Sequence, residues 1–201
     1  MKPILWRIWR FTRWPLAVLI TLYVAIVIYS FPHALEKEKT EQTIARINAQ
    51  RLTIENVNGE HLPPPPDPAQ VDATIEGVDA NANGIRDDVE LAIFEKYPNN
   101  AKVRAAELQY AMALQMYLTE VFNSETWVDA VTQNSRGYAC ISQTYPRDDL
   151  KEYIRVTDAR VDEVKTLMFN TKARQDADVH VRTFTTSFGL PNSNLCDISN
   201  Q

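Results

Sequence analysis

The chain has 201 residues, a formal net charge of −5 and a hydrophobic fraction of 45%. Its first 13 residues contain four basic side chains and no acidic one, which leaves −9 for the rest of the chain. An acidic main part argues against nucleic acids and anionic membrane surfaces as partners.

The first predicted element is a membrane-spanning helix at residues 14–34. No Asp, Glu, Lys or Arg occurs from Trp14 to Leu35. A helix of roughly 18 residues is about 27 Å long, which is close to the thickness of the hydrocarbon core of a bilayer. The basic residues of the tail 1–13 predict a cytoplasmic N-terminus, because positive charge is enriched on that side. We therefore expect a single-pass protein of the inner membrane whose C-terminal part is periplasmic and whose residues 14–34 contact lipid.

Two alternatives to a retained anchor are a cleaved signal peptide and a buried helix of a soluble protein. A signal peptide has a shorter apolar core and ends at a small-x-small site. Ile28-Tyr29-Ser30 fits such a site poorly, so we favour the anchor.

Two connecting segments follow the anchor. Residues 35–61 begin with a charged stretch that lacks Gly and Pro, and predict a solvated helical stalk or a weak partner-binding stripe. Residues 62–71 contain Pro63-Pro64-Pro65-Pro66-Asp67-Pro68, which predicts an extended Pro-rich strap; the alternative is a docking motif for an aromatic groove. The predicted domain boundary lies here, and residues 72–201 form the expected helical domain.

This domain opens with the most specific motif of the chain, between Gly77 and Glu90. Oxygen-bearing side chains alternate, a glycine follows the third, and a carboxylate stands at the twelfth position. That layout is typical of a loop that wraps Ca²⁺, with hard oxygen donors and no sulfur or imidazole. The predicted ligands are Asp79, Asn81, Asn83, the backbone carbonyl of Ile85, Asp87 through water, and a bidentate Glu90.

The pattern Asp79-x-Asn81-x-Asn83-Gly84-Ile85-x-Asp87-x-x-Glu90 resembles the calcium loops of EF-hands. It is closer still to those of thrombospondin type 3 repeats, which also carry the apolar residue directly after the glycine. The wider chain is similar to uncharacterised bacterial membrane-anchored envelope proteins, which implies no activity. The chain departs from the EF-hand pattern in its two Asn ligands, in the lack of a preceding amphipathic helix and in the lack of a second loop. The alternative is a metal-free turn in which Asp87 and Glu90 form a capping box.

The remaining residues predict a mainly α-helical bundle with no convincing strand. Apolar spacing and breakers predict helices at about 88–97, 101–122, 124–144 and 147–168, and a further helical stretch around 179–188. The fourth has the most regular apolar seam, with spacings of four and three as in helix bundles. The seam consists of Leu150, Ile154, Thr157, Val161, Val164 and Met168.

The chain has two cysteines, Cys140 and Cys196. In an oxidising compartment we expect them to form a disulfide, with two buried free thiols as the alternative. In the chain-entropy model a loop of this size gives about 4 kcal/mol of stability.

No catalytic residue can be named from the sequence. The three histidines lie far apart, Asp176 and His180 are more typical of a surface contact than of a catalytic pair, and no acid and base are singled out. The sequence therefore favours a membrane-anchored, calcium-stabilised interaction or structural protein of the envelope, with other envelope proteins as partners. The alternative is a periplasmic hydrolase with an unrecognised carboxylate site.

Overall fold

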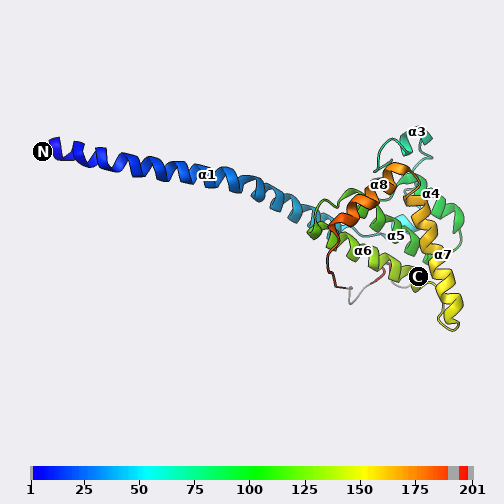
Figure 1. Ribbon diagram of the computed structural model, residues 1–201. Coiled ribbons are helices and arrows are strands. Elements are labelled where there is room, and N and C mark those ends of the chain that lie inside the picture. The colour runs from blue at the N-terminus through cyan, green and yellow to red at the C-terminus, as the bar shows by residue number, and fades with distance from the viewer. Residues whose placement is uncertain (1, 190–194, 199–201) are drawn as a thin grey trace. The chain divides into compact units, whose positions relative to one another are not determined.

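The computed structural model describes residues 2–189 and 195–198, and the side chains from residue 14 onward. It is mainly helical, with 69% helix and no strand among the residues described (Figure 1). The chain divides into two compact units, Met1–Gln42 and Thr43–Gln201. The predicted fold class is confirmed in its helical content.

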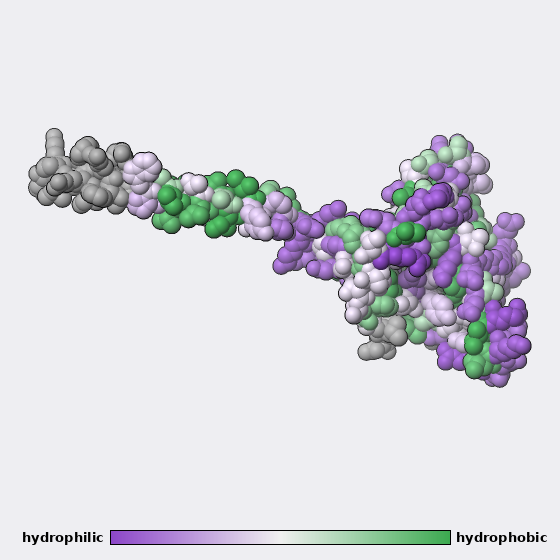
Figure 2. Space-filling model, in the orientation of Figure 1, coloured by the Kyte–Doolittle hydropathy of each residue, from purple (hydrophilic) through white to green (hydrophobic). Residues whose placement is uncertain are grey.

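The first unit consists of most of the long helix α1, Lys2–Ala49. The span from Trp14 is long and apolar enough to cross a membrane, and its apolar window is fully exposed to solvent. Figure 2 shows this window as a hydrophobic band along the helix. Pro15 lies inside α1, because the helix already begins at Lys2.

The second unit contains the remaining helices. Most begin at a residue whose side chain accepts a hydrogen bond from a free backbone N–H, as helix N-caps do; Asn100, Asn123, Asp149 and Thr171 are examples. The helices are α2 (Ile54–Asn58), α3 (Pro68–Val71), α4 (Asp87–Lys96), α5 (Ala101–Thr119), α6 (Ser124–Ser142), α7 (Leu150–Met168), α8 (Lys172–Val181) and the 3-10 turn η1 (Arg182–Phe184). The four predicted helices between 88 and 168 are confirmed to within about three residues. The stretch expected around 179–188 begins earlier, at Lys172, and its helical part ends at Phe184.

Helix α5 forms the centre of the bundle. It is buried over most of its length and packs mainly against α6 and then α7. Gly137 makes the close approach to α6 possible, because a Cβ atom there would lie 2.8 Å from the Cα of Tyr110. The helix packing therefore depends on a small residue in the centre of α6.

The seam of α7 is only partly used by the bundle. Thr157, Val161, Val164 and Met168 are buried. Leu150 and Ile154, at the N-terminal end of the same seam, are 65% and 48% exposed. The apolar stripe that the sequence predicts thus continues past the core onto the surface.

The compact unit begins before the predicted Pro-rich boundary. Ile47, Leu52 and Val57 are almost fully buried in the core, and Pro63 and Val71 of the strap are also buried. The second part of the segment predicted as a stalk therefore belongs to the bundle. The apolar residues of this segment that reach the core are widely spaced along the chain. They therefore form neither the helical nor the strand pattern that sequence analysis detects.

Polar contacts fasten the end of α1 within this unit. Arg46 forms an ion pair with Glu120. Asn48 donates a hydrogen bond to Asp129 (2.5 Å) and accepts one from Gln133 on α6 (3.0 Å).

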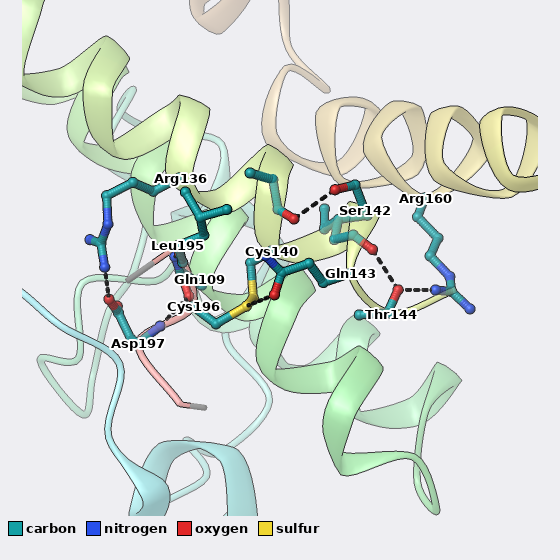
Figure 3. Close-up of a disulfide and its surroundings, with 12 residues drawn as sticks. Gln109, Arg136, Cys140, Ser142, Gln143, Thr144, Arg160, Leu195, Cys196 and Asp197 are labelled. Carbon is teal, nitrogen blue, oxygen red and sulfur yellow. Dashed lines mark hydrogen bonds and ion pairs between the residues drawn. A yellow bond between two sulfur atoms is a disulfide. The ribbon is translucent and has the colours of Figure 1, made fainter. Parts of the chain in front are cut away.

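The two cysteines form the expected disulfide, Cys140–Cys196, with Cα atoms 5.0 Å apart (Figure 3). That separation lies within the range that a disulfide requires. The bond connects α6 to residues 195–198, near the C-terminus. It closes a loop of the predicted size, with a sequence separation of 56.

Candidate metal centre

The loop from Asp79 to Glu90 is held by hydrogen bonds between its own side chains and its own backbone. The Asp79 carboxylate accepts from the backbone N–H groups of Asn83 (3.1 Å) and Gly84 (2.8 Å). Gly84 has φ 83° and Ala82 has φ 54°, so two of these three consecutive residues have a left-handed backbone conformation. Glycine tolerates this backbone and alanine does so at a steric cost. The first predicted ligand therefore organises the tight turn of the loop.

The two asparagines connect the middle of the loop to its end. The side-chain N–H groups of Asn81 and Asn83 donate to the two oxygens of Glu90, at 3.0 and 2.9 Å. The Oδ1 atom of Asn83 accepts from the N–H of Ile85 at 2.8 Å. The structure therefore brings three of the predicted ligand side chains into direct contact.

The remaining two predicted ligands lie at the start of α4. The side chain of Ile85 is buried in the core, which fixes the backbone that carries its carbonyl. The Asp87 carboxylate accepts from the N–H of Ala80 at 3.0 and 3.2 Å, and the N–H of Asp87 donates to the carbonyl of Val78 at 2.8 Å. These bonds close the loop at its base.

Two carboxyls of the loop are shielded from water. Burial raises the pKa of Glu90 above its ordinary value; the Asn81 and Asn83 amides oppose this rise, and the charges of Asp87 and Asp79 add to it. Burial also raises the pKa of Asp87, opposed by the N–H of Ala80, while Asp79 and Asp88 add to it. The carboxyl groups of the loop thus lie close together in a partly buried environment.

The capping-box alternative is not what the structure shows. The N-cap of α4 is Arg86, without a side-chain cap, and the carboxylates of Asp87 and Glu90 accept from the loop instead. Among the described residues no group of three or more His, Cys, Asp and Glu side chains is placed to hold a metal ion. The predicted ligand set is mixed: its other donors are the oxygens of Asn81, Asn83 and the Ile85 peptide.

Arg86 attaches the loop to the end of α7. Its side chain is completely buried, although it ends in a guanidinium group. The guanidinium pairs with Asp88 (2.5 Å) and donates to the carbonyls of Leu167 (2.7 Å) and Met168 (3.5 Å). These carbonyls belong to the last turn of a helix, where a cation is favoured.

Arg174 of α8, equally buried, attaches the segment before the loop. It donates to the carbonyls of Val71 (2.5 Å), Thr74 (3.1 Å) and Ile75 (3.1 Å), and pairs with Asp72 (2.9 Å). Both arginines also donate to Asn170 between α7 and α8. The aliphatic part of Arg86 packs so close to Gly77 that a Cβ atom there would lie 2.4 Å from its Cδ. We call Arg86 and Arg174 the arginine clamp.

A second unusual group is Glu107 on α5. It is 1% exposed, and its Oε1 has no hydrogen-bond partner within the described chain. Burial raises its pKa to about 7; the hydrogen bond from Tyr97 and the positive charges of Lys96 and Arg160 oppose the rise, while Glu163 adds to it. Glu107 is the one buried carboxyl whose pKa is raised close to neutrality among the described residues.

This carboxyl does not line the open groove that the described residues form at the end of α7. The groove has a volume of about 560 Å³ and lies between the end of α7 and the start of α8. Its lining consists of Asp162, Lys165, Thr166, Phe169, Asn170 and Gln175. Only one of these residues is an acid, so this groove does not supply the convergent carboxylates that the hydrolase alternative requires.

Sequence reasoning named neither the clamp nor Glu107. Arg86 occupies a position in the loop pattern that any residue can take, and Arg174 lies about 90 residues further along the chain. Their role arises from backbone carbonyls, which every residue carries. No signal in one sequence identifies such a contact.

Comparison with known protein families, characterised proteins and solved structures finds no match for this chain. A functional proposal therefore rests on the sequence and the structure of this chain.

Replacing Arg174 should destabilise the bundle strongly. In Arg174→Met the carbonyls of Val71, Thr74 and Ile75 lose their donor, and unsatisfied buried acceptors cost about 1–3 kcal/mol each. We expect a loss of about 3 kcal/mol or more in the free energy of unfolding of residues 43–201, measured by urea denaturation.

Arg155→Met is the matched control. Arg155 is exposed and pairs with Glu152 one turn away on α7, so this variant should unfold nearly as the parent does. Equal stability of the two variants would show that the clamp contributes nothing specific.

Glu107 should make stability fall as pH rises. Its folded-state pKa of about 7 lies above its ordinary value of 4.5. Its stabilising contribution is therefore complete below about pH 4.5 and is lost as pH rises through about 7. The loss is about 3 kcal/mol, because a pKa that differs by one between the folded and unfolded states corresponds to about 1.4 kcal/mol. Glu107→Gln should remove this dependence, so that the variant is more stable than the parent at pH 8 but not at pH 4.5.

Urea denaturation of residues 43–201 between pH 4.5 and 8 measures this effect. Glu95→Gln on α4, where the side chain is exposed, should leave the pH profile of the parent unchanged. The prediction is wrong if Glu107→Gln and the parent show parallel profiles.

Proposed function

We propose that this chain is a membrane-anchored envelope protein whose helical domain is stabilised by calcium and contacts other envelope components. The observation that carries the proposal is the continuous helix α1. Its exposed apolar window has the length of a membrane span, and its C-terminal end is built into the bundle. Such a connection suits a protein that holds a domain at a membrane.

The orientation follows from charge and from the disulfide. Lys2, Arg7, Arg10 and Arg13 precede the apolar window, and cytoplasmic flanks of membrane helices are enriched in Lys and Arg. The Cys140–Cys196 bond lies on the other side of the window and is favoured in an oxidising compartment. Both features support a cytoplasmic N-terminus and a periplasmic bundle.

Three properties of the loop support calcium. Its donors are hard oxygens, which calcium prefers. Asp79 already holds the tight turn by accepting from two backbone N–H groups. Burial raises the pKa of both Asp87 and Glu90, so a divalent cation would relieve a local excess of negative charge. Asp79, Asn81, Asn83, the carbonyl of Ile85, Asp87 and Glu90 would hold it, and its part would be structural.

An interaction role is supported by the free end of α7. Exposed apolar side chains on a regular helix seam are typical of surfaces that other proteins contact. Leu150 and Ile154 form such a surface. The hydrolase alternative gains no comparable support, because Glu107 is buried and does not line the groove at the end of α7.

The anchor predicts that the protein stays in the membrane pellet after alkaline carbonate extraction of a bacterial host. Its N-terminus should remain intact, and a C-terminal tag should be digested by protease added from the periplasmic side. As a control, a chain that starts at Thr43 behind a cleavable signal peptide should be soluble. Recovery of a soluble mature chain that begins near Phe31 would show a signal peptide instead.

Calcium should raise the melting temperature of residues 43–201. Binding to the folded state alone adds about 1.4 kcal/mol when calcium is tenfold above Kd. Glu90→Gln should reduce this gain most, because it removes charge from the proposed bidentate ligand. The measurement is thermal unfolding in millimolar calcium against chelator.

Glu95→Gln serves as the control for this measurement, since Glu95 lies on the same helix but is exposed. It should retain the full calcium response. An unchanged midpoint in the parent would leave the loop as a metal-free turn closed by its own hydrogen bonds.

A further inference from the structure

Residues 195–198, which we call the tail clasp, lie against α5 and α6 in the manner of a bound peptide (Figure 3). The side chain of Gln109 on α5 is 5% exposed and contacts the backbone of the clasp. It donates to the carbonyl of Leu195 at 2.7 Å and accepts from the N–H of Asp197 at 2.8 Å. An amide that both donates to and accepts from a backbone recognises an extended chain whatever its side chains are.

The side chain of Asp197 enters a carboxylate site. It is only 4% exposed. One oxygen accepts from Arg136 of α6 at 2.7 Å and lies 3.6 Å from Arg51, and the other accepts from the N–H of Leu52 at 3.0 Å. Two cations and one backbone donor therefore surround a single buried carboxylate.

The site is held in shape by other residues. Arg136 also donates to Gln133 on its own helix at 2.6 Å, which fixes the guanidinium. Arg51 and Leu52 follow directly after α1 and are positioned by its end. Arg136 and Arg51 both lie near the same carboxylate oxygen, so Asp197 offsets two positive charges in a partly buried place. The surroundings thus favour an anion.

The disulfide holds the acidic residue there. Cys196 lies between Leu195 and Asp197. The carbonyl of Leu195 accepts from Gln109, and the carboxylate of Asp197 accepts from Arg136. Cys140 is buried, whereas Cys196 is partly exposed, so Cys196 is the more accessible residue of the pair.

We propose that Gln109, Arg136, Arg51 and the Leu52 N–H form a binding site for an extended acidic peptide. The tail clasp occupies this site within the same chain, and the Cys140–Cys196 disulfide decides whether the clasp is released. The ligand class is a peptide with an Asp side chain adjacent to the backbone segment that Gln109 binds.

Release requires a dithiol reductant. One thiolate of the dithiol attacks the Sγ atom of Cys196, the S–S bond breaks, and Cys140 leaves as a thiolate that takes up a proton. The second thiol of the reductant then attacks its own sulfur in the mixed disulfide and frees Cys196. Two electrons pass to the protein disulfide, the dithiol becomes a disulfide, and both cysteines end as thiols.

Hydrogen exchange of the full-length protein in detergent tests the cis contact. Dithiothreitol should raise the exchange rate of the Leu52 amide at least tenfold, because its acceptor leaves. Asp197→Ala, which removes the acceptor, should raise it with the disulfide intact, and Asp148→Ala, at an exposed position before α7, should not. Unchanged Leu52 exchange in Asp197→Ala would overturn the site even if the reduced protein were to unfold.

A synthetic peptide of residues 192–201 carrying Cys196→Ser tests binding in trans. It should bind the reduced full-length protein but not the oxidised protein. The same peptide with Asp197→Asn should bind roughly tenfold or more weakly, as expected when a charged hydrogen-bond partner is lost. Equal binding of the two peptides, or equal binding to the oxidised and reduced proteins, would overturn the proposal.

Discussion

Two buried guanidinium groups position the candidate metal loop. Arg86 and Arg174 are fully buried, and moving a cation out of water is expensive unless its donors are satisfied. Arg174 is satisfied mainly by backbone carbonyls in residues 71–75, and Arg86 by the Asp88 carboxylate together with backbone carbonyls at the end of α7. The carbonyl acceptors cannot be removed by mutation of a side chain. Loss of either arginine, in contrast, would leave several acceptors unpaired at once.

The same organisation explains why the loop is well formed from this chain alone. Asp79 accepts from the turn, Asn81 and Asn83 donate to Glu90, and Ile85 is anchored in the core. A loop that is ordered before any cation binds loses less conformational entropy on binding. The cost is that the asparagine amides satisfy Glu90 in the metal-free form, so that a cation must compete with these hydrogen bonds. We therefore regard the proposed calcium as a stabiliser of an existing arrangement rather than as a trigger of a large change.

The sequence predicted what local patterns encode. The apolar window, the breakers between helices and the seam of α7 are periodic, so the helical fold and the candidate membrane span follow from them. The cysteine pair followed from a count and an assumed compartment. The contribution of Ile47, Leu52 and Val57 to the core was not predicted, since each contacts the bundle singly. Arg174, Glu107 and Asp197 were missed for a different reason. A charged residue in a sequence is expected at the surface, and only its partners in space show that it is buried.

The end of α1 is where the separate features meet. Gln50 donates to the carbonyl of Asn83 in the candidate metal loop at 3.3 Å, and the next two residues contact the carboxylate of Asp197 in the tail clasp. Arg46 pairs with Glu120, and Asn48 donates a hydrogen bond to Asp129 on α6. Binding of a cation that orders the loop would thus restrain Gln50. The disulfide, which holds the tail clasp in place, restrains Arg51 and Leu52. Ordering the same short segment costs conformational entropy only once. A cation in the loop and a closed tail clasp would therefore each lower the entropic cost of the other, and this coupling must be reciprocal. The proposed calcium in the loop and a closed disulfide should therefore support each other through residues 50–52, which directly follow α1.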